Sequence, residues 1–270
     1  MSDYSTLELI KDPRGFATLW LNRADKNNAF NAQMIRELIV AVDRLGADPS
    51  LRFVLLRGRG RHFSAGADLA WMQQSAQLDF NTNLDDAHQL GDLMYNLYNL
   101  KLPTLAVVQG AAFGGALGLI SCCDMAIGSE DAQFCLSEVR IGLAPAVISP
   151  FVVKAIGERA TRRYALTAER FSGVRAQQLG LLAEAYPAEQ LDQQVEAWVD
   201  NLLLNSPQAL RASKDLLREV GHGELTPAVR RYCENSIARI RVSAEGQEGL
   251  RAFLDKRRPA WQPTDKDARP

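Results

Sequence analysis

The segment VVQGAAFGGALGLISCCD, residues 107–124, carries the clearest indication of the fold. It starts as an apolar strand, breaks into glycine and alanine, and continues with residues that can wind into a helix. Similar signals alternate before it: GFATLWLN (15–22) is typical of a strand, NAQMIRELIVAVDRLGAD (31–48) of a helix capped by Asn31, and FVLLRG (53–58) of a strand. This alternation predicts an α/β sheet with crossover helices.

The sequence changes character from Pro187 onward, where helical patterns become nearly continuous. Segments such as LDQQVEAWVDNLLLN (191–205) and PQALRASKDLLREV (207–220) place apolar residues at helical spacing. We therefore expect two parts, an α/β core over residues 1–190 that holds the functional site and a helical C-terminal region over residues 191–270.

The charge balance argues against nucleic acid and acidic membranes as partners, because 31 basic and 32 acidic residues give a net charge of −1. The four cysteines lack the spacing of a disulfide framework or a metal site, and the N-terminus lacks the layout of a signal peptide. These features predict reduced thiols, no metal, and a cytoplasmic protein that acts on small molecules.

One stretch raises the alternative of a membrane span, because residues 102–123 contain no charged side chain and include a GxxxG pattern from Gly114 to Gly118. Against this, the stretch contains Pro103 and Gln109, and its many alanines and glycines contribute little apolar area. We therefore favour a buried strand and helix over a span.

Two loops combine small residues with a preceding strand: HFSAGADL (62–69) and GAAFGGALG (110–118). At such turns, backbone N–H groups lack intrahelical partners, and small side chains let a ligand approach them. Two such groups that converge can form an oxyanion hole, which stabilises charge on a carbonyl oxygen. The alternative is that each loop is merely a tight strand-to-helix turn.

Four motifs in order resemble those of the crotonase, or enoyl-CoA hydratase/isomerase, family: LNRADKNNAFN (21–31), FSAGADL (63–69), VQGAAFGGALGL (108–119) and AQFCLSEVRIGLAP (132–145). The resemblance implies a spiral of ββα turns whose helical C-terminal region serves trimerisation, with trimers often pairing into hexamers. It also implies an acyl-CoA thioester as substrate and no separate cofactor, since coenzyme A is part of the substrate.

The resemblance assigns roles to individual positions. The N–H groups of Ala67 and Gly115 would hold the thioester oxygen, and Glu138 would transfer protons; the alternative for Glu138 is a structural ion pair with Arg140. For Asp68 we expect mainly a helix cap. The residues implied to bind substrate are Lys26, Ala29, Ala65, Asp68, Leu69, Gly114, Gly118, Phe253 and Lys256.

Two departures from the family pattern narrow the expected reaction. Gly118 stands where hydratases commonly carry a first glutamate, and IGLAPAVISPFVV (141–153) replaces a common glycine-rich turn. Both resemble the bacterial branch that hydrates 3-methylglutaconyl-CoA in leucine breakdown and related carboxylated esters in acyclic terpene breakdown. We therefore expect a lyase that adds water to a branched, carboxylated 2-enoyl-CoA through Glu138 alone, with space beside Gly118 for substrate or water.

Other functions stay open from the sequence. An isomerase could shift a double bond with Glu138 as its only base, and a decarboxylase could act on the same acyl skeleton. A non-catalytic scaffold that binds acyl-CoA or RNA is the alternative from a different class, although the near-neutral charge argues against RNA.

Overall fold

The computed structural model describes residues 4–221 and 224–262 and divides the chain into two compact units. The first unit comprises Met1–Leu100 with Thr104–Val195, and the second comprises Lys101–Pro103 with Glu196–Pro270, within those described ranges. The first is a mixed α/β structure and the second is helical, which confirms the predicted fold class.

A six-stranded sheet forms the centre of the first unit. Only β1 is antiparallel to its neighbour; the other neighbouring strands run parallel. In sheet order the strands are β1 (Leu7–Asp12), β2 (Phe16–Leu21), β3 (Val54–Gly58), β4 (Thr104–Val108), β6 (Met125–Ser129) and β9 (Glu184–Tyr186). Every residue of β4 is buried, as expected for a parallel strand covered on both faces.

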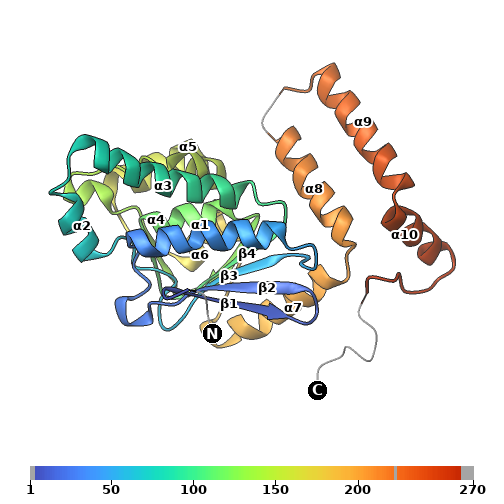
Figure 1. Ribbon diagram of the computed structural model, residues 1–270, viewed down its shortest axis with the longest axis horizontal. Helices are drawn as coiled ribbons and strands as arrows, with labels where there is room; N and C mark the ends of the chain where they lie inside the picture. The colour runs from blue at the N-terminus through green and yellow to red at the C-terminus, as the bar shows by residue number, and fades with distance from the viewer. Residues whose placement is uncertain (1–3, 222–223, 263–270) are drawn as a thin grey trace. The chain divides into compact units, whose positions relative to one another are not determined.

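A second, three-stranded sheet consists of β5 (Ala111–Phe113), β7 (Gln133–Cys135) and β8 (Phe171–Ser172). Helices α1 (Ala32–Ala47) and α3 (Phe80–Tyr98) run side by side over one face of the larger sheet (Figure 1). The remaining helices that begin and end in this unit are α2 (Leu69–Ser75), α4 (Gly115–Cys122), α5 (Ser149–Thr167), α6 (Gly173–Leu179), and the short 3-10 helices η1 (Ala24–Lys26), η2 (Glu138–Ile141) and η3 (Ala188–Gln190).

Helix α1 forms where the sequence predicts it. The side chain of Asn31 accepts a hydrogen bond from the N–H of Met34, which caps the helix as expected. Its apolar stripe is buried, and it consists of Met34, Ile35, Leu38, Ala41, Val42 and Leu45. Burial of this stripe fixes the helix on the sheet.

The segment 107–124 contains one element more than expected. It supplies the end of β4, then the short strand β5 where a plain loop was predicted, and then α4. The apolar run is therefore divided among three buried elements. No helix in the described part of the chain combines the length and apolarity needed to cross a membrane. The four cysteines are all free thiols.

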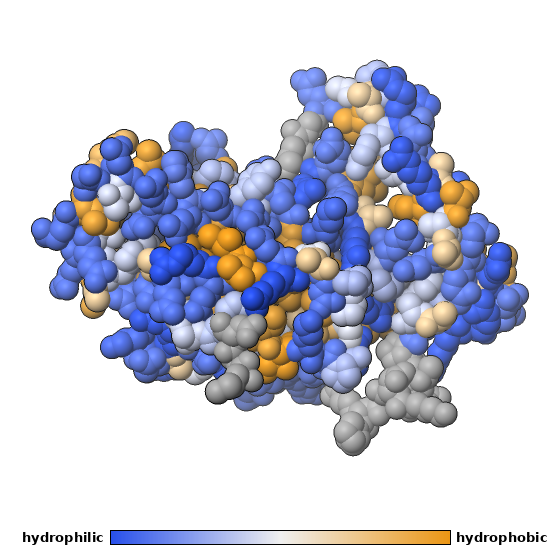
Figure 2. All heavy atoms as spheres, viewed as in Figure 1, coloured by the Kyte–Doolittle hydropathy of each residue, from blue (hydrophilic) through white to orange (hydrophobic). Residues whose placement is uncertain are grey.

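Helix α7 (Leu191–Leu203) crosses from the first unit into the second, which continues with α8 (Pro207–Val220), α9 (Pro227–Val242) and α10 (Ala244–Leu254). Several apolar side chains of this unit are exposed, including Val242, Phe253 and Leu254. Figure 2 shows small apolar patches in the region of α9 and α10 on an otherwise mostly hydrophilic surface. These helices leave apolar faces without a covering partner in the described residues of their own unit.

Candidate active site

The two small-residue loops lie against each other through backbone hydrogen bonds. The N–H of Phe63 donates to the carbonyl of Gln109 at 2.8 Å, and the N–H of Ser64 donates to that of Ala111 at 3.0 Å. In return, the N–H of Phe113 donates to the carbonyl of Ser64 at 3.0 Å. Segments about fifty positions apart in the sequence thus form one surface.

A glycine with a left-handed backbone precedes each predicted oxyanion donor. Gly66 has φ +94° and precedes Ala67, and Gly114 has φ +53° and precedes Gly115. This conformation, which L side chains rarely adopt, turns the following N–H away from the regular hydrogen-bond pattern. Within the described residues, neither the N–H of Ala67 nor that of Gly115 meets an acceptor. Both donors are available to a ligand.

Ala67 and Gly115 line the same cavity, which we call the inner cavity. It has a volume of about 190 Å³. Among the described residues that line it, Glu138 is the one that ionises, and the others are apolar. The lining residues are Phe30, Ile35, Ala67, Trp71, Leu90, Gly115, Glu138, Ala144, Pro145, Ala146, Val147 and Ile148. The structure therefore brings together the three residues predicted to carry the chemistry.

Glu138 is held at the start of η2, with its carboxylate beside Gly114. A Cβ added to Gly114 would lie only 3.2 Å from Oε1 of Glu138, so a larger residue there would crowd the carboxylate. Oε2 is buried and has no hydrogen-bond partner among the residues that the structure describes. Burial raises the pKa of Glu138 above its ordinary value, and a hydrogen bond from its own N–H offsets this only in part. No ion pair with Arg140 appears among the described contacts.

A larger, open groove adjoins the inner cavity, and we call it the outer groove. Its volume is about 720 Å³, within the usual range for ligand sites. The groove is lined by five of the residues that the family resemblance implies to bind substrate, Lys26, Ala29, Ala65, Asp68 and Leu69, and their contact with substrate stays a prediction. Ala67 and Trp71 line both the groove and the inner cavity, so the two spaces meet at these residues.

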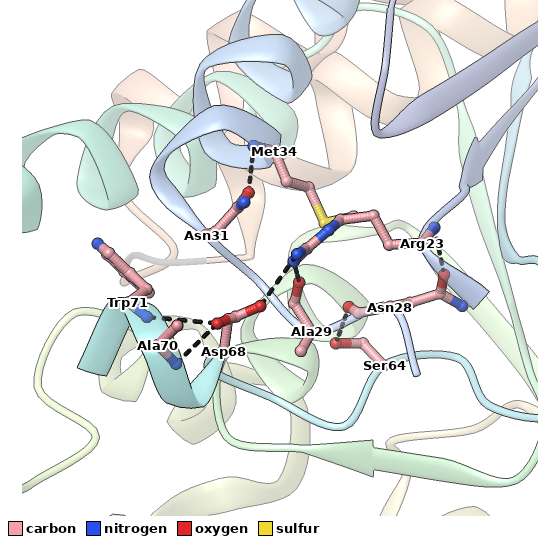
Figure 3. Close-up of polar contacts among 9 residues, drawn as sticks. All are labelled: Arg23, Asn28, Ala29, Asn31, Met34, Ser64, Asp68, Ala70 and Trp71. Carbon is pink, nitrogen blue, oxygen red and sulfur yellow. Dashed lines mark hydrogen bonds and ion pairs between the residues drawn. The ribbon is translucent and has the colours of Figure 1, made fainter. Parts of the chain in front are cut away.

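An ion pair between Arg23 and Asp68 joins two segments that line the outer groove (Figure 3). Arg23 donates from Nη2 to Oδ2 of Asp68 at 3.0 Å and from Nη1 to the carbonyl of Ala29 at 2.6 Å. Asp68 also accepts hydrogen bonds from the N–H groups of Ala70 and Trp71, and so caps α2 as predicted.

Hydrogen bonds and the nearby Arg23 charge lower the pKa of Asp68 by more than burial raises it. Burial alone would raise the pKa of its carboxyl, but the hydrogen bond from Arg23, those from the N–H groups of Trp71 and Ala70, and the Arg23 charge lower it below its ordinary value. Asp68 is thus a stably ionised structural group.

The sequence reasoning did not single out Arg23, Phe30 or Trp71. Arg23 lies inside the quoted motif LNRADKNNAFN, which could have drawn attention to it. The ring of Phe30 lies 3.4 Å from where a Cβ on Gly115 would be, and Phe30 also pairs with Ala67 through a β-bridge. It therefore holds both donor segments, a role that no local pattern indicates.

The expectation of open space beside Gly118 is wrong. Gly118 is buried and is not among the residues that line the inner cavity. A Cβ added there would lie 2.9 Å from Cβ of Ile148 and 3.0 Å from Cε of Met94, with Cγ2 of Ile148 closer still. The place of a side chain at position 118 is already filled by Ile148. Phe253 and Lys256 lie in the second unit, and their contact with substrate stays a prediction.

The sequence of this chain is similar to those of known proteins over most of its length. Residues 11–264 match the family model described as Enoyl-CoA hydratase/isomerase. A Thermus thermophilus protein described as a candidate enoyl-CoA hydratase is 34% identical over 91% of this chain and 96% of its own. The 2,3-dehydroadipyl-CoA hydratase of Escherichia coli is 28% identical over 90% of this chain and 94% of its own.

A solved structure is also similar. The crystal structure of an enoyl-CoA hydratase from Shewanella pealeana is 46% identical and superposes with a TM-score of 0.91, covering 96% of this chain and 97% of that one. The two chains share one fold over almost their whole length.

Proposed function

The chain belongs to the enoyl-CoA hydratase/isomerase family. We propose that it adds water to a branched 2-enoyl-CoA, with Glu138 as its only proton-transferring side chain. Its relatives identify it as an enzyme of the hydro-lyase class. One observation supports the proposal most: Glu138 lines the same small cavity as Ala67 and Gly115, and within the described residues neither its Oε2 nor the backbone N–H groups of those two residues have a hydrogen-bond partner.

The N–H groups of Ala67 and Gly115 are proposed to bind the thioester carbonyl oxygen. Negative charge develops on this oxygen when a nucleophile adds to the conjugated double bond. A preorganised backbone donor typically contributes about 3–4 kcal/mol to stabilising such charge. The outer groove would hold the coenzyme A portion along Lys26, Ala29 and Leu69.

Glu138 is proposed to serve both proton transfers. Its carboxylate takes a proton from water while the oxygen of that water bonds to C3 and the π electrons move into the thioester enolate. The resulting carboxylic acid then gives the proton to C2 as the enolate collapses. The raised pKa of Glu138 suits the first step, because it makes the carboxylate a stronger base toward water, and the acid formed in that step is the proton donor for the second.

The lining of the inner cavity indicates which kind of acyl group the cavity can accept. A carboxylate inside this cavity would find no cationic partner among the lining residues and would lie beside Glu138, which is costly. We therefore propose a branched, uncharged acyl group as the best fit. 3-Methylglutaconyl-CoA is the second candidate; the glycine at position 118 and the APAVISP stretch favour it, and the E. coli relative is named for a dicarboxylic substrate.

A panel of acyl-CoA esters, followed by mass spectrometry, tests the proposed reaction. The panel contains crotonyl-CoA, 3-methylcrotonyl-CoA and 3-methylglutaconyl-CoA. We expect the 3-methyl ester without a carboxylate to gain one water fastest. An unchanged mass with a moved double bond would indicate an isomerase instead, and loss of carbon dioxide a decarboxylase.

Assembly of several copies is the proposed role of the second unit. Phe253 is 82% exposed and the adjacent Leu254 is 76% exposed, and contiguous exposed apolar residues can mark a site of protein–protein contact. We expect a trimer or hexamer in sedimentation, with Phe253 and Lys256 near a coenzyme A site. Phe253→Ser should weaken assembly, whereas Leu166→Ser, on an exposed residue of α5 in the first unit, serves as control; a fully active wild-type monomer would refute the proposal.

A further inference from the structure

The side chain of Ile148 fills the space that a side chain at position 118 would need. Gly118 lies in the middle of α4, and Ile148 is the residue just before α5. Ile148 is 3% exposed, and both its Cβ and its Cγ2 lie too close to Gly118 for a Cβ at that position. Met94, which is fully buried, closes the same space from α3. A side chain at position 118 and isoleucine at position 148 therefore exclude each other.

Ile148 is also part of the wall of the inner cavity. Residues 144–148 provide a continuous stretch of the lining of this cavity, and Phe30 and Trp71 line it from other segments. Isoleucine is branched at Cβ and has few accessible χ1 rotamers, so it cannot easily turn away from either neighbour. Its position is thus fixed by Gly118 on one side and limits the cavity on the other.

From this geometry we propose that Ile148 is a specificity-determining residue, which closes the acyl cavity and restricts the enzyme to short acyl groups. The proposal rests on the proposed function and deepens it by assigning the acyl-length limit to one side chain. Gly118 is, in this account, the residue that makes room for Ile148, and it makes no contact with substrate.

Truncation of Ile148 provides the first test. In Ile148→Ala we expect the ratio of kcat/KM for 2-decenoyl-CoA over that for 3-methylcrotonyl-CoA to rise by about 10-fold or more, since even one methylene in a hydrophobic pocket changes discrimination by about 10–200-fold. Ile156→Ala is the matched control, because Ile156 is a buried residue of α5 that does not line the inner cavity. This control should lower the melting temperature and leave the ratio unchanged.

A double-mutant cycle provides the second test. Gly118→Ala should lower the melting temperature clearly in the wild-type background and less in the Ile148→Ala background, where Cγ2 is gone. Additive changes in melting temperature would overturn the proposed exclusion between the two side chains.

Binding of saturated acyl-CoA esters distinguishes a wrong role for Ile148 from a wrong proposed reaction. Dissociation constants for butyryl-CoA and decanoyl-CoA, which have no double bond to hydrate, report on the cavity alone. If Ile148→Ala and Ile156→Ala give the same ratio of these constants and of kcat/KM, Ile148 does not set the acyl limit. If the wild-type protein hydrates no ester while Ile148→Ala still gains affinity for decanoyl-CoA, only the proposed reaction fails.

Discussion

The outer groove and the inner cavity each hold one carboxylate, and the two carboxylates differ in almost every respect. Asp68, at the groove, accepts hydrogen bonds from a guanidinium and two backbone N–H groups, and its pKa is lowered. Glu138, at the cavity, lies among apolar side chains, its Oε2 has no hydrogen-bond partner in the described part of the chain, and its pKa is raised. The two residues nevertheless belong to adjoining spaces that share Ala67 and Trp71.

The surroundings, rather than the residue type, therefore separate a structural carboxylate from one suited to proton transfer. A fully satisfied carboxylate such as Asp68 gains little from accepting a proton. An unsatisfied one such as Glu138 can exchange a proton with water or substrate at little cost. Substitutions at either carboxylate, or at a backbone donor of the inner cavity, test this difference.

The largest effect is expected from Glu138→Gln. The amide keeps the shape of the side chain but cannot transfer a proton, so kcat should fall by about 10⁴-fold or more, at or above the upper end for a general acid–base group. Because the raised pKa means that an ionised Glu138 costs stability at neutral pH, the melting temperature should stay equal or rise. Near-normal turnover in this variant would exclude Glu138 from the reaction.

Removal of one backbone donor should have the next largest effect. Gly115 is the first residue of α4, a position where proline is well tolerated, and Gly115→Pro deletes the N–H. We expect kcat to fall by about 10²–10³-fold with the helix intact. Gly115→Ala is the control, because it keeps the N–H and its Cβ would meet Phe30 at an ordinary 3.4 Å. Equal losses in both variants would indicate crowding rather than a lost donor.

Substitution of Asp68 should affect stability more than chemistry. Asp68→Ala removes both the cap of α2 and the partner of Arg23 and should cost about 2–3 kcal/mol of unfolding free energy. Asp68→Asn keeps a capping side chain and should cost less. Both variants should retain kcat within about 10-fold, the size of a modest positioning effect. Urea unfolding together with kinetics on one ester measures both quantities; a loss of kcat as large as in Glu138→Gln would contradict the structural role.

Sequence patterns could predict the α/β class, the cap at Asn31 and the grouping of Ala67, Gly115 and Glu138, because each rests on local spacing or on ordered motifs. They could not predict what lies beside Gly118. Ile148 reaches it from thirty positions away, and only packing of α4 against the start of α5 brings the two together. The role of Arg23 could not be predicted for the same reason, since its partner Asp68 is forty-five positions distant.

Proton transfer by Glu138 can be tested through the pH dependence of kcat/KM for hydration, measured for the wild-type protein and for Asp68→Asn. The reaction needs ionised Glu138 in the free enzyme, so the rate should fall as the pH drops through the pKa of this residue. We predict an acid limb with its midpoint above 4.5, the ordinary value for glutamate, and the same midpoint in Asp68→Asn. A midpoint at or below 4.5, or one that moves when Asp68 is replaced, would contradict the assignment of proton transfer to Glu138.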